Sequence, residues 1–304
     1  MDMMVWIGLV NGLLYAGLLF MIASGFTLVF GLMRIVNMAH GAMYLLAAYI
    51  GWLVQRNTAD WFESSAGSWI LGVVVAAVVV AVATVALQEG LLRWVQGDEL
   101  RETLLTLGVA IALGDIMHGL WGGDHRTIRT PDFMRGFQEL DLGFMGGPVL
   151  FLAKNQLYMF GTAVVVGILL WLLISRTQLG RIIRAGVDNR AMVSALGINI
   201  NRVFLAVMIL AGVITGVSGV LGGMIYAFGP GIDMNMLTLS LIVVIVGGMG
   251  SLGGAALGAL LVGVVDQLTL ALYPEYPTIA LFAILIVTLL LRPKGLLGRV
   301  WVNA

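Results

Sequence analysis

Long apolar segments recur along the whole chain and restrict the folds that it can adopt. A helix needs about 20 residues to cross the hydrocarbon core of a bilayer. About eight runs of roughly that length occur, at residues 4–33, 38–54, 69–89, 103–121, 149–174, 203–228, 237–272 and 278–291. Hydrophobic residues make up 60% of the 304-residue chain and charged residues 11%, which excludes an ordinary soluble domain. We therefore expect an all-α polytopic membrane protein, with residues 1–304 forming one integral domain.

The distribution of lysine and arginine predicts how this chain is oriented. The segment 176–202 and the tail after Leu291 together hold 8 of the 16 basic residues and one acid. Loops that are rich in lysine and arginine stay on the cytoplasmic side. Counting spans from these loops places the N-terminus outside and the C-terminus inside. The run 237–272 must then start and end outside, so it is a re-entrant hairpin or two short spans, broken at the glycine-rich residues 247–254.

The segment 176–202 is a polar island between two apolar runs. It holds five arginines and a single acid, Asp188. At 3.6 residues per turn, a helix here has one face with Ile183, Val187, Ala191, Ala195 and Ile198, and another with Arg181, Arg184 and Asp188. Such a helix either receives a push from a soluble partner or lies on lipid headgroups. The segment alone favours neither interpretation.

Two glycine-containing interruptions of the apolar pattern, one in each half of the chain, are candidates for a transport path. The first is Gly31 to Gly41, and the second comprises Phe228 to Asn235 and the glycine cluster 247–254. Interrupted helices survive in membranes where protein or water satisfies the freed backbone groups, and their ends can bind charged groups of a solute. The position of the two breaks also suggests a pseudo-repeat of two halves. A plain helix cap at Asn37 is the alternative for the first break. The candidate path residues are Asn37, His40 and Gly41 at the first break and Gly248, Gly250 and Ser251 at the second.

Three other features suggest different functions. Asp115 and His118 share a helix face in the run 103–121, as a proton-coupled secondary carrier requires. The stretch Gly-Val-Ser-Gly at 216–219 matches a pattern of intramembrane proteases, with Ser218 as the nucleophile. That chemistry needs a base, and no histidine follows His125. The three histidines do not have the spacing of metal ligands, so we expect no metal site.

Four ordered motifs resemble one family of membrane proteins. The stretch LVNGLLYAGLLFMIASGFTLVFGLMRIVNMAHGAMYLLAAY (residues 9–49) is similar to the opening of branched-chain amino-acid ABC transporter permeases of the LivH type, with Met38 in place of the usual phenylalanine. The resemblance continues in GRIIRAGVDNRAMVSALGI, in VGGMGSLGGAALGALLVG (residues 246–263) and in RPKGLLG (residues 292–298). It covers essentially the whole chain.

The resemblance implies a permease subunit of an ATP-driven importer in the cytoplasmic membrane. Its partners would be membrane lipid, a second permease subunit, two ATP-binding subunits and an extracytoplasmic binding protein. ATP and magnesium would bind the partners, so this chain would need no cofactor and would not be an enzyme. Nucleic acid is not an expected partner. Branched-chain amino acids are the expected solutes, while related amino acids, urea or short amides stay open, as does a homodimeric permease core.

The resemblance also assigns a role to the polar island as the coupling helix that docks on the ATP-binding subunits. The residues that match the family pattern are Arg184, Ala185, Asp188, Ala191, Gly197 and Ile198. Small side chains at Ala191 and Ala195 suit close docking, and arginines such as Arg181 can pair with acids on a partner. With the resemblance added, docking is favoured over lipid binding. The loop from Gly122 to Pro148 is a candidate docking surface for the binding protein.

Overall fold

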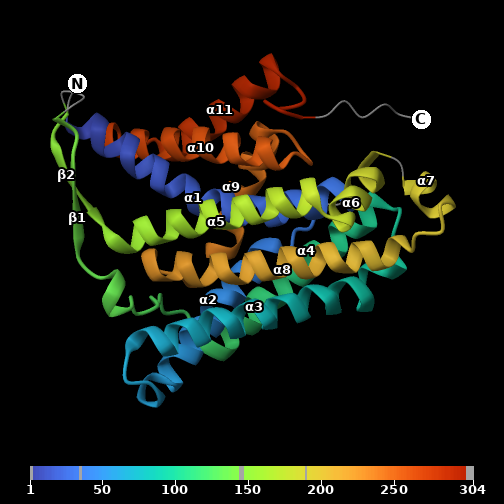
Figure 1. Ribbon diagram of the computed structural model, residues 1–304, viewed down its shortest axis with the longest axis horizontal. Helices are drawn as coiled ribbons and strands as arrows, with labels where there is room; N and C mark the ends of the chain where they lie inside the picture. The colour runs from blue at the N-terminus through green and yellow to red at the C-terminus, as the bar shows by residue number, and fades with distance from the viewer. Residues whose placement is uncertain (1–2, 34–35, 144–146, 189, 299–304) are drawn as a thin grey trace.

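The long helices lie side by side along the long axis of the molecule (Figure 1). The computed structural model describes residues 3–33, 36–143, 147–188 and 190–298, without the side chains of residues 187, 188, 190 and 191. Over this part of the chain the helices before the polar island are α1 Met3–Met33, α2 His40–Asn57, α3 Ser65–Gly90, α4 Glu99–Trp121 and α5 Lys154–Arg176. The helices that follow are α6 Gln178–Asp188, α7 Arg190–Ala195, α8 Ile200–Ile225, α9 Ile232–Gly247, α10 Leu252–Leu272 and α11 Pro277–Leu291.

The two ends of the molecule differ in structure. An antiparallel hairpin of two strands, β1 Phe137–Asp141 and β2 Val149–Ala153, lies at one end. The short helices α6 and α7 lie at the opposite end (Figure 1). We refer to these as the hairpin end and the α6 end.

Six of the described helices are long and apolar enough to cross a membrane: α1, α3, α4, α5, α8 and α10. The helices α9 and α11 are also apolar but shorter. The prediction of a mostly helical, polytopic membrane protein is therefore confirmed.

The hairpin corrects one part of that prediction. Residues 149–153 were expected to begin a span, but they form β2, and the helix starts only at Lys154. An apolar run of five residues fits a strand as well as a helix, so periodicity cannot separate the two. In the fold, Leu150 and Leu152 point to the same side of the strand and pack with Leu14 of α1. The mostly helical structure stays consistent with the expected all-α membrane protein, and only the start of this span is corrected.

The core is built around α1 and α8. The helix α1 packs along α10, α8 packs along α3, and α2 contacts α3, α8 and α9. Side chains of α1 are buried along almost its whole length, whereas α4 and α5 expose most of theirs. A helix that is apolar on every side and central in the protein needs other helices around it, while a peripheral apolar helix can face lipid.

The predicted interruption in the run 237–272 is present. The helix α9 ends at Gly247, α10 begins at Leu252, and four residues join them. Gly248 and Gly250 have φ angles of +110° and +79°. Residues with a Cβ atom rarely adopt such angles, so the turn depends on glycine at both positions.

The described helical part of the polar island ends before Ile198. The helix α6 is described as far as Asp188 and α7 covers Arg190–Ala195. Gly197, which follows, has a φ angle of +79°. The apolar face predicted from Ile183 to Ile198 therefore does not reach Ile198 along a helix, and its positions 187 and 191 lie outside the described side chains.

Candidate functional site

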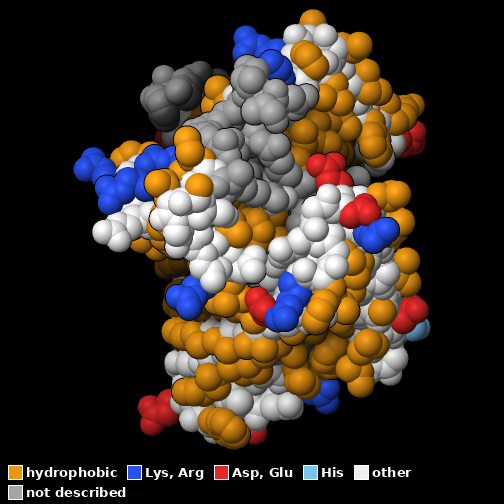
Figure 2. All heavy atoms as spheres, turned by 90° about the vertical axis from the view of Figure 1, so that its right-hand side faces the viewer, with side chains coloured by type: hydrophobic (Ala, Val, Ile, Leu, Met, Phe, Trp, Pro, Cys, Tyr) orange, Lys and Arg blue, Asp and Glu red, His pale blue; other side chains and the backbone are white. Residues whose placement is uncertain are grey.

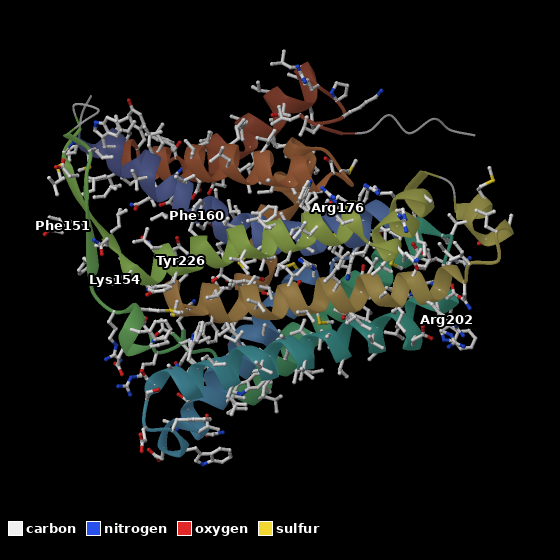
Figure 3. The ribbon with its side chains drawn as sticks, viewed as in Figure 1. Phe151, Lys154, Phe160, Arg176, Arg202 and Tyr226 are labelled. Atoms are coloured by element: carbon white, nitrogen blue, oxygen red, sulfur yellow. The ribbon has the colours of Figure 1, made fainter. Side chains whose placement is uncertain are left out.

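A groove of about 680 Å³ runs between α1, α5 and α10. Its lining on α1 extends from Leu13 to Leu32, about 28 Å at the helical rise of about 1.5 Å per residue. This length is close to the roughly 30 Å of a bilayer hydrocarbon core. Aliphatic and aromatic side chains form most of the wall, including Phe20, Phe160, Val164, Ile168, Trp171 and Leu260. Phe160 lies on α5, towards the hairpin end (Figure 3).

The groove becomes polar towards the α6 end. We call this part the polar end of the groove; its residues are Thr27, Ser175, Arg184, Gly250 and Ser251. The hydroxyl oxygens of Thr27 and Ser175 are buried, and neither has a hydrogen-bond partner among the described residues. Each buried hydroxyl that lacks a partner is costly, so such groups point to a ligand or water.

The second chain break supplies part of the polar end. Ser251 caps α10, and its hydroxyl oxygen accepts a hydrogen bond of 3.0 Å from the Gly254 N–H. The C-terminal tail satisfies the end of α9, since the N–H groups of Leu296 and Leu297 each donate to an α9 carbonyl at 2.9 Å. The two glycine-rich motifs near the end of the sequence therefore meet here. Of the predicted path residues, Gly250 and Ser251 line the groove, and Gly248 lies behind them against the tail.

The helix α6 lies at the polar end of the groove. Ile183 is buried and Arg184 is half-buried, and both line the groove. Arg181 and Ala185 are exposed on the same helix. Gly186 faces the side chain of Leu32 in α1. One helix of 11 residues thus contacts the groove on one face and leaves another face free.

The other predicted coupling residues have varied positions. Ala195 and Gly197 are exposed, and Gly197 has a φ angle of +79°. Ile198 is half-buried against the core. The side chains of Asp188 and Ala191 lie outside the described residues, so their predicted roles stay predictions.

Gly31, at the start of the first chain break, lines the groove, whereas residues 37–41 lie in the packed interior and do not line it. Asn37 is buried, and its side-chain oxygen accepts a hydrogen bond of 3.1 Å from the Ala39 N–H. The His40 ring nitrogen Nε2 lies 3.0 Å from the Ile22 carbonyl oxygen, and its ring meets Phe26 edge-on. A Cβ atom at Gly41 would overlap the carbonyl oxygen of Asp233 in α9. A path role for Asn37, His40 and Gly41 stays a prediction without a cavity beside them.

Two polar residues of the groove were missed from the sequence. Thr27 and Ser175 each stand among apolar residues close to the end of a predicted span. An isolated hydroxyl residue in a span is common, because it can bond to the carbonyl one turn earlier, as Thr84 and Ser218 do. The signal that separates Thr27 and Ser175 from these is the missing partner, which only the structure reveals.

The features that suggested other functions do not form sites. Asp115 and His118 are both exposed on α4, and no hydrogen bond joins them. Ser218 is buried, and its hydroxyl donates to the Thr215 carbonyl at 2.9 Å. The described residues show no hydrogen bond between Ser218 and a histidine, and the His40 ring nitrogen Nε2 lies 3.0 Å from the Ile22 carbonyl oxygen instead.

Comparison with known proteins gives the family. The family model described as "Branched-chain amino acid transport system / permease component" matches residues 8–290. The chain belongs to this family. This permease is therefore a multi-pass membrane protein and not an enzyme.

Relatives of known name match along the whole chain. One relative is the high-affinity branched-chain amino acid transport system permease protein BraD of Pseudomonas aeruginosa. The two sequences are 30% identical over 295 residues, and the alignment covers 96% of this chain and 95% of BraD. The permease is 27% identical to LivH of Escherichia coli, over 95% of this chain and 94% of LivH. A shorter match, 32% over 149 residues, links it to the fructose import permease protein FrcC of Rhizobium meliloti, over 46% of this chain and 40% of FrcC.

One solved structure supports the fold. PsaBC from Streptococcus pneumoniae, in complex with Fab, matches over 94% of this chain and 92% of the PsaBC chain, with a TM-score of 0.50 and 12% sequence identity. At that identity the likeness concerns the fold alone.

Proposed function

We propose that this chain is a permease subunit of an ATP-driven importer of branched-chain or related amino acids. The groove between α1, α5 and α10 forms this subunit's share of the translocation path. One observation carries the proposal: α6 places Ile183 and Arg184 in the groove and presents Arg181 and Ala185 to the outside. The same short helix can therefore contact a motor subunit and the path.

The proposed orientation puts the α6 end in the cytoplasm. Arg176 and Arg202 lie at this end, whereas Phe151 and Lys154 lie at the hairpin end (Figure 3). Figure 2 looks onto the α6 end, where lysine and arginine side chains stand at several points among apolar ones. A basic excess on the cytoplasmic side is the rule for membrane proteins, and the cytoplasmic membrane is the proposed location.

The helices α9 and α10 fit a re-entrant hairpin that starts and ends outside. The helix α9 has 16 residues, about 24 Å at the helical rise, and its first turn holds the buried Asp233 against Gly41 of α2. The hairpin then counts as one of eight membrane segments, which leaves the N-terminus outside and the C-terminus inside.

An inverted repeat accounts for the helix packing. We assign α1–α4 to one half and α8–α11 to the other, with α5 to α7 as the connection. The helix α1 packs along α10 as α8 packs along α3, and α2 meets α9. The closest contacts correspond too, because Gly12 of α1 lies against the Val264 backbone of α10 and Gly216 of α8 against the Ala77 backbone of α3.

The proposed mechanism uses α6 as the moving part. Closure of two ATP-binding subunits around ATP and magnesium displaces α6, and the side chains of Ile183 and Arg184 move with it. The polar end of the groove then changes from open to closed towards the cytoplasm, and a second permease subunit covers the open side of the groove. This chain, as one permease domain over residues 1–304, would supply no cofactor-binding chemistry of its own.

The hairpin end offers an ordered surface for a soluble binding protein. Gln55 of α2 exchanges two hydrogen bonds with the Arg129 backbone, at 2.8 and 2.9 Å. The Ser65 hydroxyl donates to the Asp132 carboxylate at 2.7 Å, which lowers the pKa of Asp132. These bonds hold residues 129–132 of the loop on the helices, and the strands β1 and β2 expose Phe137 and Phe151.

Reconstitution tests the proposed function. In proteoliposomes that contain the permease with its second permease subunit, ATP-binding subunits and binding protein, leucine uptake should require ATP. The variant Ala185→Trp should uncouple ATP hydrolysis from uptake, because an added bulky side chain in a docked surface costs about 1–3 kcal/mol. Leu104→Trp, at an exposed position of α4, is the matched control and should transport normally.

Two results would contradict the proposal. Uptake driven by a pH gradient without the ATP-binding subunits would identify a secondary carrier. Normal ATP-driven uptake by Ala185→Trp would remove the exposed face of α6 from the coupling contact.

A further inference from the structure

The polar end of the groove gathers hydrogen-bond donors from four helices. Thr27 of α1 is only 3% exposed, and its hydroxyl has no partner among the described residues. Ser175 of α5 is only half-buried as a residue, but its hydroxyl oxygen is buried and also has no partner among the described residues. Arg184 of α6 adds a permanent positive charge to the same lining.

The fourth contribution is the N-terminus of α10. Ser251 accepts the Gly254 N–H, so the first free N–H groups of this 21-residue helix belong to Leu252 and Gly253, which also line the groove. Free N–H groups and the helix dipole make a helix N-terminus favourable for an anion. The buried, unpartnered hydroxyl of Thr27, which lines the same groove, is an independent sign of a missing acceptor.

The only charged side chain in the described lining of the groove is positive. The described lining includes Arg184 but no aspartate or glutamate. An ammonium group would find no carboxylate there, whereas a carboxylate would find a guanidinium, two hydroxyls and backbone N–H groups. The adjoining wall is apolar, with Leu28, Ile174 and Leu260 beside the polar residues.

We propose that the polar end of the groove binds the carboxylate of a small aliphatic acid, held by Thr27, Arg184 and the N-terminus of α10. Ser175 adds a further hydroxyl, and the aliphatic body of the ligand lies along the apolar wall towards the hairpin end. The inference rests on the proposed function and deepens it, since it names the chemical group by which the permease recognises its substrate. Because Arg184 belongs to α6, the carboxylate contacts the helix that we propose to move.

The sequence contains no cysteine, so a single introduced thiol can report on the groove. Ala256→Cys places one thiol in the groove, and Leu257→Cys places one on the neighbouring exposed face of α10 that does not line it. Each full-length variant is held in nanodiscs of phosphatidylcholine and exposed to a methanethiosulfonate reagent. The probes are leucine, isocaproate (leucine without its amine) and isoamylamine (leucine without its carboxylate).

We expect only the ligands that carry a carboxylate to protect the thiol at residue 256 from modification. Leucine and isocaproate should slow modification at residue 256 and leave residue 257 unaffected, and isoamylamine should protect neither. Arg184→Gln in the Ala256→Cys background should raise the half-protecting concentration about tenfold or more, since hydrogen bonds to charged groups are the strong ones. Arg101→Gln on α4, an exposed arginine at the same end, is the control and should not change protection.

A second substitution separates binding from a structural role. Thr27→Val should weaken protection by isocaproate. It should not lower the thermal midpoint of the ligand-free protein, because the hydroxyl that it removes is buried and makes no hydrogen bond there. Thr215→Val, which removes a buried hydroxyl that donates to the Ala211 carbonyl at 2.8 Å, should leave protection unchanged.

Three outcomes would overturn the inference. They are protection by isoamylamine equal to that by isocaproate, no protection by either carboxylate, and full protection by phosphatidylglycerol in the nanodisc without any acid. The last result would make the groove a lipid site. If ATP-driven uptake is intact while any of these is observed, the carboxylate site is wrong and the importer function stands; if ATP-driven uptake itself is absent, the importer function is wrong.

Discussion

The two chain breaks of this permease share a sequence pattern but have opposite surroundings. In the first break, Gly31 to Gly41, Gly31 lines the groove, but residues 37–41 lie inside the packed core, where Asn37 and His40 have partners within the protein. The second break, residues 248–251, lies beside the groove, and Ser251 and Gly250 contribute to its wall. Both contain glycine and a polar residue, so the pattern alone does not separate them.

The difference shows what determines the role of a broken helix in a membrane. Freed backbone groups must be satisfied by protein or face a water-accessible space. At the first break, α9 packs directly on the chain and leaves no space beside Gly41. At the second break, the C-terminal tail satisfies the end of α9, while the start of α10 is left facing the groove. The neighbouring helices, and not the break, create the site.

The largest expected effect comes from filling the first break. Gly41→Val should prevent folding or lower the free energy of unfolding by about 3 kcal/mol, because its side chain would collide with the α9 backbone. Gly253→Val is the control, since a Cβ atom there meets only a side-chain carbon of Leu297 at 3.7 Å. Size-exclusion chromatography and thermal unfolding in detergent measure both. Equal stability of the two variants would show that the first break is not tightly packed.

A smaller loss of stability is expected from His40→Ala. The substitution removes a buried ring that packs on Phe26, and such cavities cost about 2–3 kcal/mol. Uptake per folded molecule should stay close to that of the unmodified permease, because His40 does not line the groove. A selective loss of uptake with an unchanged thermal midpoint would place His40 in the path instead.

The smallest effect on stability is expected from Ser251→Ala. Loss of the helix cap costs about 1 kcal/mol. Uptake should fall more than stability does, since Ser251 lines the polar end of the groove. Measured side by side, His40→Ala should lose mainly stability, whereas Ser251→Ala should lose mainly uptake. The comparison of the two breaks fails if both variants lose only stability.

Much of the fold could be predicted from hydropathy. Each of the eight apolar runs overlaps at least one described helix, and the interruption within 237–272 lies where the glycines predicted it. The hairpin strand at residues 149–153 was missed because a short apolar run has no distinctive period. The end of the helical segment at Ala195 was missed because the apolar positions continue at helical spacing to Ile198.

The groove could be predicted only in part. Gly250 and Ser251 were found because a helix break is visible in the sequence, and Arg184 because it matches a family pattern. That these residues lie together depends on how α1, α5 and α10 pack, which is a tertiary property. The lack of a partner for Thr27 is likewise visible only when its neighbours are placed.

State-dependent access to the groove tests the central claim most directly. In the reconstituted importer, a membrane-impermeant thiol reagent is applied to Ala256→Cys and Leu257→Cys, once without nucleotide and once with a non-hydrolysable ATP analogue. The account predicts that ATP binding changes the modification rate at residue 256 and leaves the rate at residue 257 unchanged. Identical rates at residue 256 in both states, or no modification in either, would contradict a translocation path in this groove.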